Sequence, residues 1–261
     1  MSKRRIDALL AERGLAESRT SAAASVRAGR VRVGRGGEVA AKPSQLVADD
    51  VELAVDEPPP YVSRGGVKLA NALDALEIDV GGMRCLDVGA STGGFTDCLL
   101  KRGATEVVAV DVGRGQLDWR LREDSRVRVH EGVNARELTG EQLPFAPELA
   151  TVDVSFISLG LVIPAVAGCL VEGGELLALV KPQFELDPDR VGKGGVVRDP
   201  EARRDVLRRA SRAASESNLG VRGFAPSGLP GPKGNRETFV WAVKGAESID
   251  DVEGAIEAVN A

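Results

Sequence analysis

The stretch from residue 84 to residue 100 carries the side chains and backbone best suited to bind a ligand. Cys85 to Val88 is a short apolar run broken only by Asp87, residues 89–94 are small and glycine-rich, and a helical pattern begins at Phe95. A strand, a glycine turn and a helix N-terminus bring backbone N–H groups up to a ligand in doubly wound sheets. The glycines read G-x-x-x-G-G, which differs from the G-x-G-x-x-G of dinucleotide-binding enzymes.

An acidic residue stands where it could bind the ribose of such a ligand. Asp111 ends the next predicted strand, Val107–Val110, and follows Gly89 by 22 positions. An acid at this spacing can bond both hydroxyls of a ribose. The ligand expected is therefore a nucleoside without a pyrophosphate, and S-adenosylmethionine is the common one. A tight turn followed by a surface acid is the alternative interpretation. The predicted cofactor contacts are Asp87, Gly89, Ser91, Thr92, Gly93, Gly94, Phe95, Asp111, Val112, Asn134 and Asp153.

Charged residues recur at the ends of other predicted strands. Asp153 lies near the end of strand 149–155, and Lys181 ends strand 175–181. In an open sheet such ends line the crevice where ligands bind. Glu237 begins the last predicted strand, 237–243, so an antiparallel last strand would bring Glu237 to the same edge. Each residue alone reads as a surface charge, whereas the joint arrangement predicts one site.

The elements that position these residues alternate between strand and helix without an internal repeat, which predicts a parallel or mixed open sheet. Hydrophobic residues make up 43% of the chain and aromatic residues 3%, so its core must be mostly Val, Leu and Ala. No run approaches 18 apolar residues, and the N-terminus lacks a signal peptide's apolar core, so a cytoplasmic protein outside the membrane is expected. Three scattered cysteines indicate reduced core thiols. A single histidine argues against a metal site.

The N-terminal region differs in charge from the rest. Residues 1–48 contain ten basic and four acidic residues, a net charge of +6, while the whole chain carries −5. A basic head on an acidic body indicates a polyanionic partner, with an ordinary solvated helix surface as the alternative. Helices are predicted within residues 4–13 and 19–27, and strands at 30–33 and 51–55. The prolines after Asp56 predict a linker. The expected divisions are residues 1–57, a linker at 58–63, a second domain at 64–246 and a tail or helix at 247–261.

The head resembles the S-four RNA-binding domain, a small α+β module that recurs in RNA-modifying enzymes. The resemblance rests on the run of residues 5–20, Arg-Ile-Asp-Ala-Leu-Leu-Ala-Glu-Arg-Gly-Leu-Ala-Glu-Ser-Arg-Thr, and on Arg-Ala-Gly-Arg-Val-Arg-Val at 27–33. Residues of the two helices and the following turn face structured RNA in that module. The candidate phosphate contacts that it implies here are Arg4, Arg5, Arg19, Arg27 and Arg30. Such contacts position RNA without reading its sequence.

Five motifs in order resemble the TlyA family of ribosomal RNA 2′-O-ribose methyltransferases with an FtsJ-type domain. They are Ser-Arg-Gly-Gly-x-Lys-Leu, Leu-Asp-Val-Gly-Ala-Ser-Thr-Gly-Gly-Phe-Thr, Asp-Val-Ser-Phe-Ile-Ser-Leu, Val-Lys-Pro-Gln-Phe-Glu and Gly-Pro-Lys-Gly-Asn-x-Glu. The resemblance implies a Rossmann-like α/β domain, a cytidine target in ribosomal RNA or ribosomal subunits, and a catalytic set of Lys68, Asp153, Lys181 and Glu237. The interdomain tetrapeptide departs from the family, reading within Pro-Pro-Pro-Tyr-Val.

Methylating a ribose hydroxyl requires its proton to leave as the oxygen attacks the methyl group, and a positioned base gives ~10²–10⁴-fold. Lys181 is the candidate base, Lys68 is the next, and no metal is needed. A monomer or weak dimer is expected. Three alternatives stand beside this hypothesis: an RNA-binding ribosome-assembly factor without catalysis, a haemolysin, and a nicotinamide oxidoreductase, which the glycine spacing disfavours.

Overall fold

The computed structural model describes residues 3–259 and divides the chain into two compact units, Met1–Pro59 and Pro60–Ala261. The first unit contains β1 (Lys3–Arg5), α1 (Ile6–Glu12), α2 (Arg19–Arg27), β2 (Val31–Val33), β3 (Glu38–Val39), β4 (Leu46–Ala48) and β5 (Leu53–Val55). β1 pairs with β4, and β2 lies between β3 and β5. A small core that includes Ile6, Leu10 and Val26 joins the two helices to the strands.

The expected helix over residues 4–13 is wrong at its start. Arg4 and Arg5 belong to β1, where Arg4 pairs with Val47 in an antiparallel ladder, and the helix begins only at Ile6. The partner strand lies more than forty residues further along the chain, so the local pattern of apolar residues does not report it. Both arginines therefore extend from a strand rather than from a helix face.

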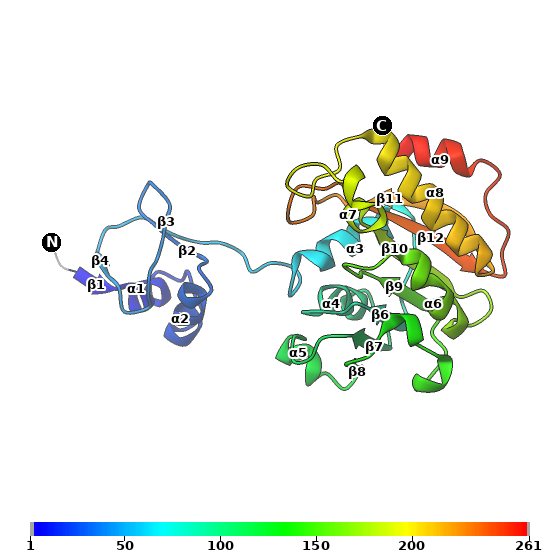
Figure 1. Cartoon of the computed structure of the whole chain (residues 1–261). Helices are drawn as coiled ribbons and strands as arrows, with labels where there is room; N and C mark the ends of the chain where they lie inside the picture. Colours follow the sequence, from blue (N-terminus) through cyan, green and yellow to red (C-terminus); the bar gives the residue numbers. More distant parts are fainter. Residues whose placement is uncertain (1–2, 260–261) are drawn as a thin grey trace. The chain divides into compact units, whose positions relative to one another are not determined.

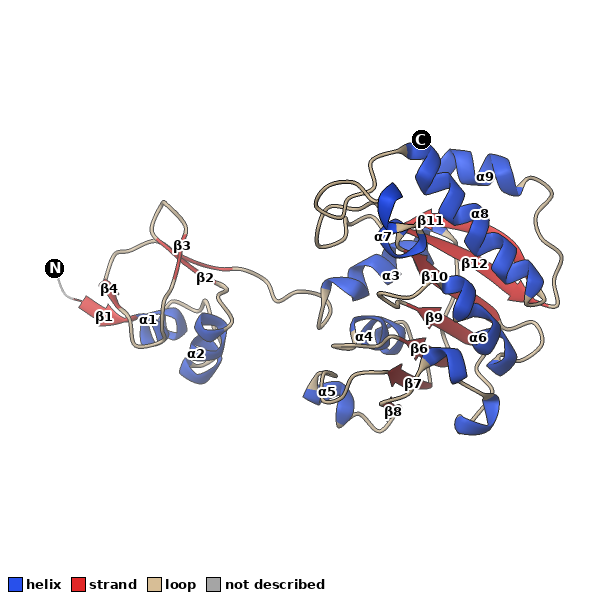
Figure 2. Cartoon of the chain, in the orientation of Figure 1, coloured by secondary structure: helices blue, strands red, loops and turns tan. Residues whose placement is uncertain are grey.

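The second unit is a seven-stranded sheet with helices on both faces (Figures 1 and 2). The strand order is β11-β12-β10-β9-β6-β7-β8, and β12 runs antiparallel to both of its neighbours. This confirms the α/β class. The strands are β6 (Arg84–Val88), β7 (Glu106–Asp111), β8 (Val127–Glu131), β9 (Leu149–Val152), β10 (Glu175–Val180), β11 (Leu219–Pro226) and β12 (Thr238–Lys244). The helices are α3 (Arg64–Ala75), α4 (Gly94–Lys101), α5 (Trp119–Arg122), α6 (Ile163–Cys169), α7 (Pro182–Glu185), α8 (Pro200–Glu216) and α9 (Val252–Val259).

Alternate strand residues supply two separate cores, as expected for a sheet covered on both faces. On one face, Leu86 and Val88 of β6 belong to the cluster that includes Ile163 of α6 and Val206 of α8. On the other, Cys85 of β6 belongs to the cluster of α3 and α4. The sheet is therefore packed against helices on both faces, and its parallel strands end at one edge. Over residues 3–259, no helix is long and apolar enough to span a membrane.

Candidate active site

The glycine turn after β6 passes against the backbone that follows β9. Gly89 has φ +85°, and a Cβ atom there would lie 2.5 Å from the carbonyl oxygen of Asp153. A side chain at this position would therefore clash with backbone and require an unfavourable conformation. The Gly89 and Ala90 amides donate to the carbonyl of Val110 at 2.8 and 3.1 Å, which ties the turn to β7.

Asp87 lies behind this turn and does not line either cavity described below. Its buried carboxylate accepts hydrogen bonds from the Thr96 amide at 2.9 Å and the Thr96 hydroxyl at 2.7 Å, so it joins β6 to α4. Burial raises the pKa of Asp87 to about 7, against the opposing effect of the Thr96 hydrogen bond. At Gly93, a Cβ atom would meet Leu121. Asp87 and Gly93 were predicted as cofactor contacts, and neither lines these two cavities.

Asp111 ends β7 beside a second cavity. Its two oxygens accept from the Ser91 amide at 2.7 Å and the Gly113 amide at 2.6 Å. This cavity measures about 570 Å³ and is lined by Val112, Asn134 and Ser91 among others. The Asn134 side chain accepts from the Arg136 amide at 3.2 Å and donates to Glu137 at 2.9 Å, so it also caps the short helical turn Ala135–Glu137.

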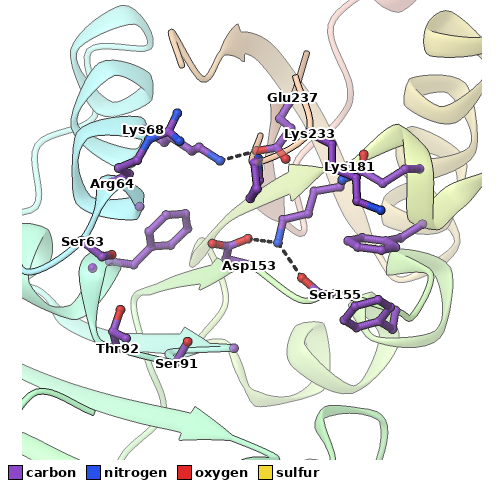
Figure 3. A pocket seen from close by; sticks show the side chains of 18 of the residues that line it. Ser63, Arg64, Lys68, Ser91, Thr92, Asp153, Ser155, Lys181, Lys233 and Glu237 are labelled. Carbon is purple, nitrogen blue, oxygen red and sulfur yellow. Dashed lines mark hydrogen bonds and ion pairs between the residues drawn. The ribbon is translucent and has the colours of Figure 1, made fainter. Parts of the chain in front are cut away.

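The four charged residues of the predicted catalytic set line one cavity of about 780 Å³ (Figure 3). Lys68 of α3 forms an ion pair with Glu237, and their side chains are 9% and 1% exposed. The Lys181 ammonium group lies 2.5 Å from Asp153 and donates to the Ser155 hydroxyl at 3.0 Å. These are two separate pairs, each of opposite charge, that line the same cavity.

Strand register explains how residues so far apart in sequence meet. Asp153 directly follows β9 and Lys181 directly follows β10, and these strands are parallel neighbours. Glu237 directly precedes β12, whose Thr238 pairs with Val180 of β10 in antiparallel register. The start of β12 and the end of β10 therefore lie side by side. The predicted convergence depends on the antiparallel last strand, which the structure contains.

The two cavities share a wall. Gly89, Ser91 and Asp153 line both the large cavity with the charged pairs and the smaller one beside Asp111. The glycine turn would therefore separate the ribose of a nucleoside bound by Asp111 from the charged pairs. Thr92, Gly94 and Phe95 line the large cavity but not the smaller one.

Several residues at the cavity were not predicted from the sequence. Phe156 has φ +64°, is 90% exposed, and its ring lies 4.8 Å from that of Phe184. A left-handed backbone at a non-glycine residue is costly and is found mainly at functional sites. Lys233 also lines the cavity. No local feature of the sequence indicates the exposure or the backbone angle of Phe156. Lys233 lies in the motif Gly-Pro-Lys-Gly-Asn-x-Glu, of which only the glutamate was predicted to belong to the site.

The arginines of the first unit have unequal freedom to meet RNA. Arg5 and Arg19 both contact Asp7, at 2.7 and 3.3 Å, and the hydrogen bond from Arg5 is the main reason that the pKa of Asp7 falls to about 2. Arg4 contacts Glu12 and Asp49. Arg30 donates to Ser25 at 2.9 Å. Within the described residues, Arg27 is the member of this set with no such partner. The acids fix the direction of the first three guanidinium groups.

Comparison with known proteins agrees with this arrangement. The family model for FtsJ-like methyltransferases matches residues 61–244, and that for the S4 domain matches residues 4–53. The 16S/23S rRNA (cytidine-2′-O)-methyltransferase TlyA of Mycobacterium tuberculosis is 47% identical, with 98% of this chain and 96% of the relative covered. Hemolysin A of Brachyspira hyodysenteriae is 38% identical over 89% of this chain and 97% of the relative.

Solved structures show the same fold. A structure from Streptococcus thermophilus that carries a hemolysin name has a TM-score of 0.76 and 42% identity, and covers 100% of this chain and 95% of that chain. Fibrillarin from Aeropyrum pernix, solved with bound S-adenosyl-L-methionine, has a TM-score of 0.50 at 18% identity over 69% of this chain and 76% of that chain, a likeness of fold alone. The chain therefore belongs to the FtsJ-like methyltransferase family and, within it, to the group of the TlyA ribosomal RNA methyltransferases.

Proposed function

We propose that this chain transfers a methyl group from S-adenosylmethionine to the ribose 2′-hydroxyl of a cytidine in ribosomal RNA, acting on ribosomal subunits in the cytoplasm. The observation that carries the proposal is the shared wall at Gly89, Ser91 and Asp153, because it joins a nucleoside-sized cavity to a cavity lined by two lysine–carboxylate pairs. The relatives named for this reaction support the choice of substrate.

The residues present fit the cofactor. Asp111 has carboxylate lone pairs beyond the two that accept from backbone amides, and these can accept from ribose hydroxyls. The absence of a side chain at Gly89 keeps the turn close to Asp153. When bound, S-adenosylmethionine supplies an electrophilic methyl group on a sulfonium centre. The RNA supplies the attacking hydroxyl, and the protein must supply the base and the alignment of the two reactants.

In this proposal Lys181 receives the proton of the attacking hydroxyl. Its Nζ atom contacts Asp153 and Ser155, and its side chain is 12% exposed. In each cycle Nζ gives one proton to water and then takes one from the hydroxyl, while Asp153 and Ser155 hold it in the cavity. The Lys68–Glu237 pair lines the same cavity and orients the ribose. Holding oxygen, methyl carbon and sulfur in line contributes the remainder of the rate.

Phe156 and Phe184 offer a surface for the base of the target nucleotide. Both line the large cavity, and their rings contact each other at its mouth. Stacking of a base on an aromatic side chain contributes about 1–3 kcal/mol and needs no particular base. Choice of cytidine must therefore come from polar groups around the rings.

A direct test is transfer of labelled methyl groups to purified ribosomal subunits, followed by mapping of 2′-O-methyl positions. The full chain should label a ribose in at least one subunit, and Lys181→Ala should not, although both bind S-adenosylmethionine in calorimetry. A wild-type chain that binds the cofactor yet labels neither subunit would remove the proposal. The RNA-binding part is tested separately: residues 1–59 alone should bind ribosomal RNA weakly, with affinity that falls as salt rises.

A further inference from the structure

A third cavity, of about 490 Å³, adjoins the catalytic one and is strongly basic. Arg198, Arg203, Lys233 and Arg236 make up four of its seven lining residues, and the other three are uncharged. Among residues 3–259, none of these four side chains forms an ion pair with a carboxylate. By contrast, Arg190, Arg204 and Arg208 nearby all do. An arrangement of unneutralised cations around a hollow indicates an anion-binding site.

Arg203 is the most deeply buried basic side chain of this cavity. It belongs to α8, is 9% exposed, and donates one hydrogen bond, from Nη1 to the Arg198 carbonyl at 2.9 Å. Its buried Nε atom has no hydrogen-bond partner among the described residues. Burial, and then the nearby Arg236, lower the pKa of Arg203, although Asp199 opposes them. A buried guanidinium group is costly without a compensating anion, so an anion in the cavity beside Arg203 would lower that cost.

Asn235 holds the rim of the cavity in place. It is 1% exposed, its Oδ1 atom accepts from the Val197 amide at 2.8 Å, and its Nδ2 atom donates to the Gly195 carbonyl at 2.7 Å. Asn235 therefore joins two glycine-rich loops, residues 191–198 and residues 227–237. Lys233 lines both this cavity and the catalytic cavity. An anion bound here would therefore lie next to the ribose that is methylated.

We propose that this cavity binds a backbone phosphate of the RNA strand beside the target nucleotide. The inference rests on the function proposed above. The planar fork of an arginine suits the oxygens of a phosphate, and phosphate contacts fix the register of a strand without reading its bases. In this site the phosphate is neutralised by Arg203, Arg236 and Lys233, so the neighbouring ribose is held against Lys181.

The test compares two cavity variants with a matched control in the full chain. Arg236→Gln removes an exposed cation, Arg203→Lys keeps the charge but removes the Nε donor, and Arg212→Gln removes an exposed arginine elsewhere on α8. KM and kcat for isolated ribosomal subunits are measured over a range of salt concentrations, and S-adenosylmethionine affinity by calorimetry. We expect Arg236→Gln to raise KM about tenfold and to reduce the salt slope by roughly 0.7–0.9. Arg203→Lys should also raise KM, but with little change in the salt slope, because the charge is kept. Arg212→Gln should match the wild type.

A second arm separates RNA phosphate from free phosphate. Inorganic phosphate is titrated into each variant by calorimetry. An active wild type whose KM and salt slope are unchanged in both cavity variants overturns the proposal. Phosphate binding that disappears in the variants while KM for subunits stays unchanged assigns the cavity to a free anion and also overturns it. If the wild type binds S-adenosylmethionine but methylates no ribosomal RNA, the proposed function fails first, and the RNA assignment fails with it.

Discussion

Breaking the Lys68–Glu237 pair should destabilise the second unit strongly, whichever partner is removed. The two side chains are 9% and 1% exposed, so each charge relies on the other rather than on water. In Lys68→Met, the Glu237 carboxylate stays buried without its cation, and in Glu237→Leu the ammonium group is left alone. Removing one member of a buried pair costs about 3–5 kcal/mol. We expect each single variant to lose stability in that range.

The double variant Lys68→Met with Glu237→Leu should recover most of the loss, because a buried pair replaced by apolar residues of similar volume is often close to neutral. Urea unfolding followed by tryptophan fluorescence measures the free energy of unfolding of the second unit by itself. Both tryptophans, Trp119 and Trp241, belong to the second unit, so the signal does not report on the first. The coupling energy from the four proteins should exceed about 2 kcal/mol.

Activity should not follow stability in this series. The double variant folds but lacks two charged groups of the catalytic cavity, so it should remain inactive. Single variants that each lose less than about 1 kcal/mol, or a double variant whose loss equals the sum of the singles, would contradict the reasoning that these charges are buried and mutually dependent.

Three further predictions concern other parts of the site. Asp111→Ala should weaken S-adenosylmethionine binding by about 1–3 kcal/mol, because ribose hydroxyls lose an ionised acceptor; unchanged affinity in calorimetry would reject the ribose assignment. Lys181→Arg should be nearly as inactive as Lys181→Ala, because arginine cannot act as a base; single-turnover methylation within about tenfold of wild type, less than 1.4 kcal/mol of barrier, would exclude that role and turn attention to Lys68. Asp87, with a usual pKa of 3.8 raised by burial to about 7, keeps a proton in the folded state that the unfolded chain releases, so its contribution to stability should weaken as pH rises from about 4 to 7. Urea unfolding of wild type and Asp87→Asn across that range should show the dependence in the wild type only, and equal pH dependence would count against it.

Features that depend on short stretches of sequence were predictable. The glycine turn with Asp111 and the charges at the ends of β9 and β10 follow from local apolar runs and their terminators. Strand β11 (Leu219–Pro226) was not predicted. Its partner is β12, beyond a long loop, and Gly220 and Gly223 interrupt its apolar pattern.

Features formed by pairing between distant residues were not predictable. Arg4 and Arg5 are in a strand because β4 lies beside them, and the basic cavity around Arg203 assembles from two loops and a helix. In the sequence, Arg203 is one of several arginines on a polar helix. Only its burial distinguishes it from neighbours such as Arg204, and burial is set by tertiary packing.

The position of β12 has a consequence for how the enzyme is made. Chains are synthesised from the N-terminus, and domains fold as units as they emerge. β12 lies between β10 and β11 in the interior of the sheet, and Glu237 directly precedes it. A nascent chain can expose its basic head, its glycine turn and Lys181 while the strand that brings Glu237 is still inside the ribosome. The Lys68–Glu237 ion pair can therefore form only after the chain has been synthesised as far as β12.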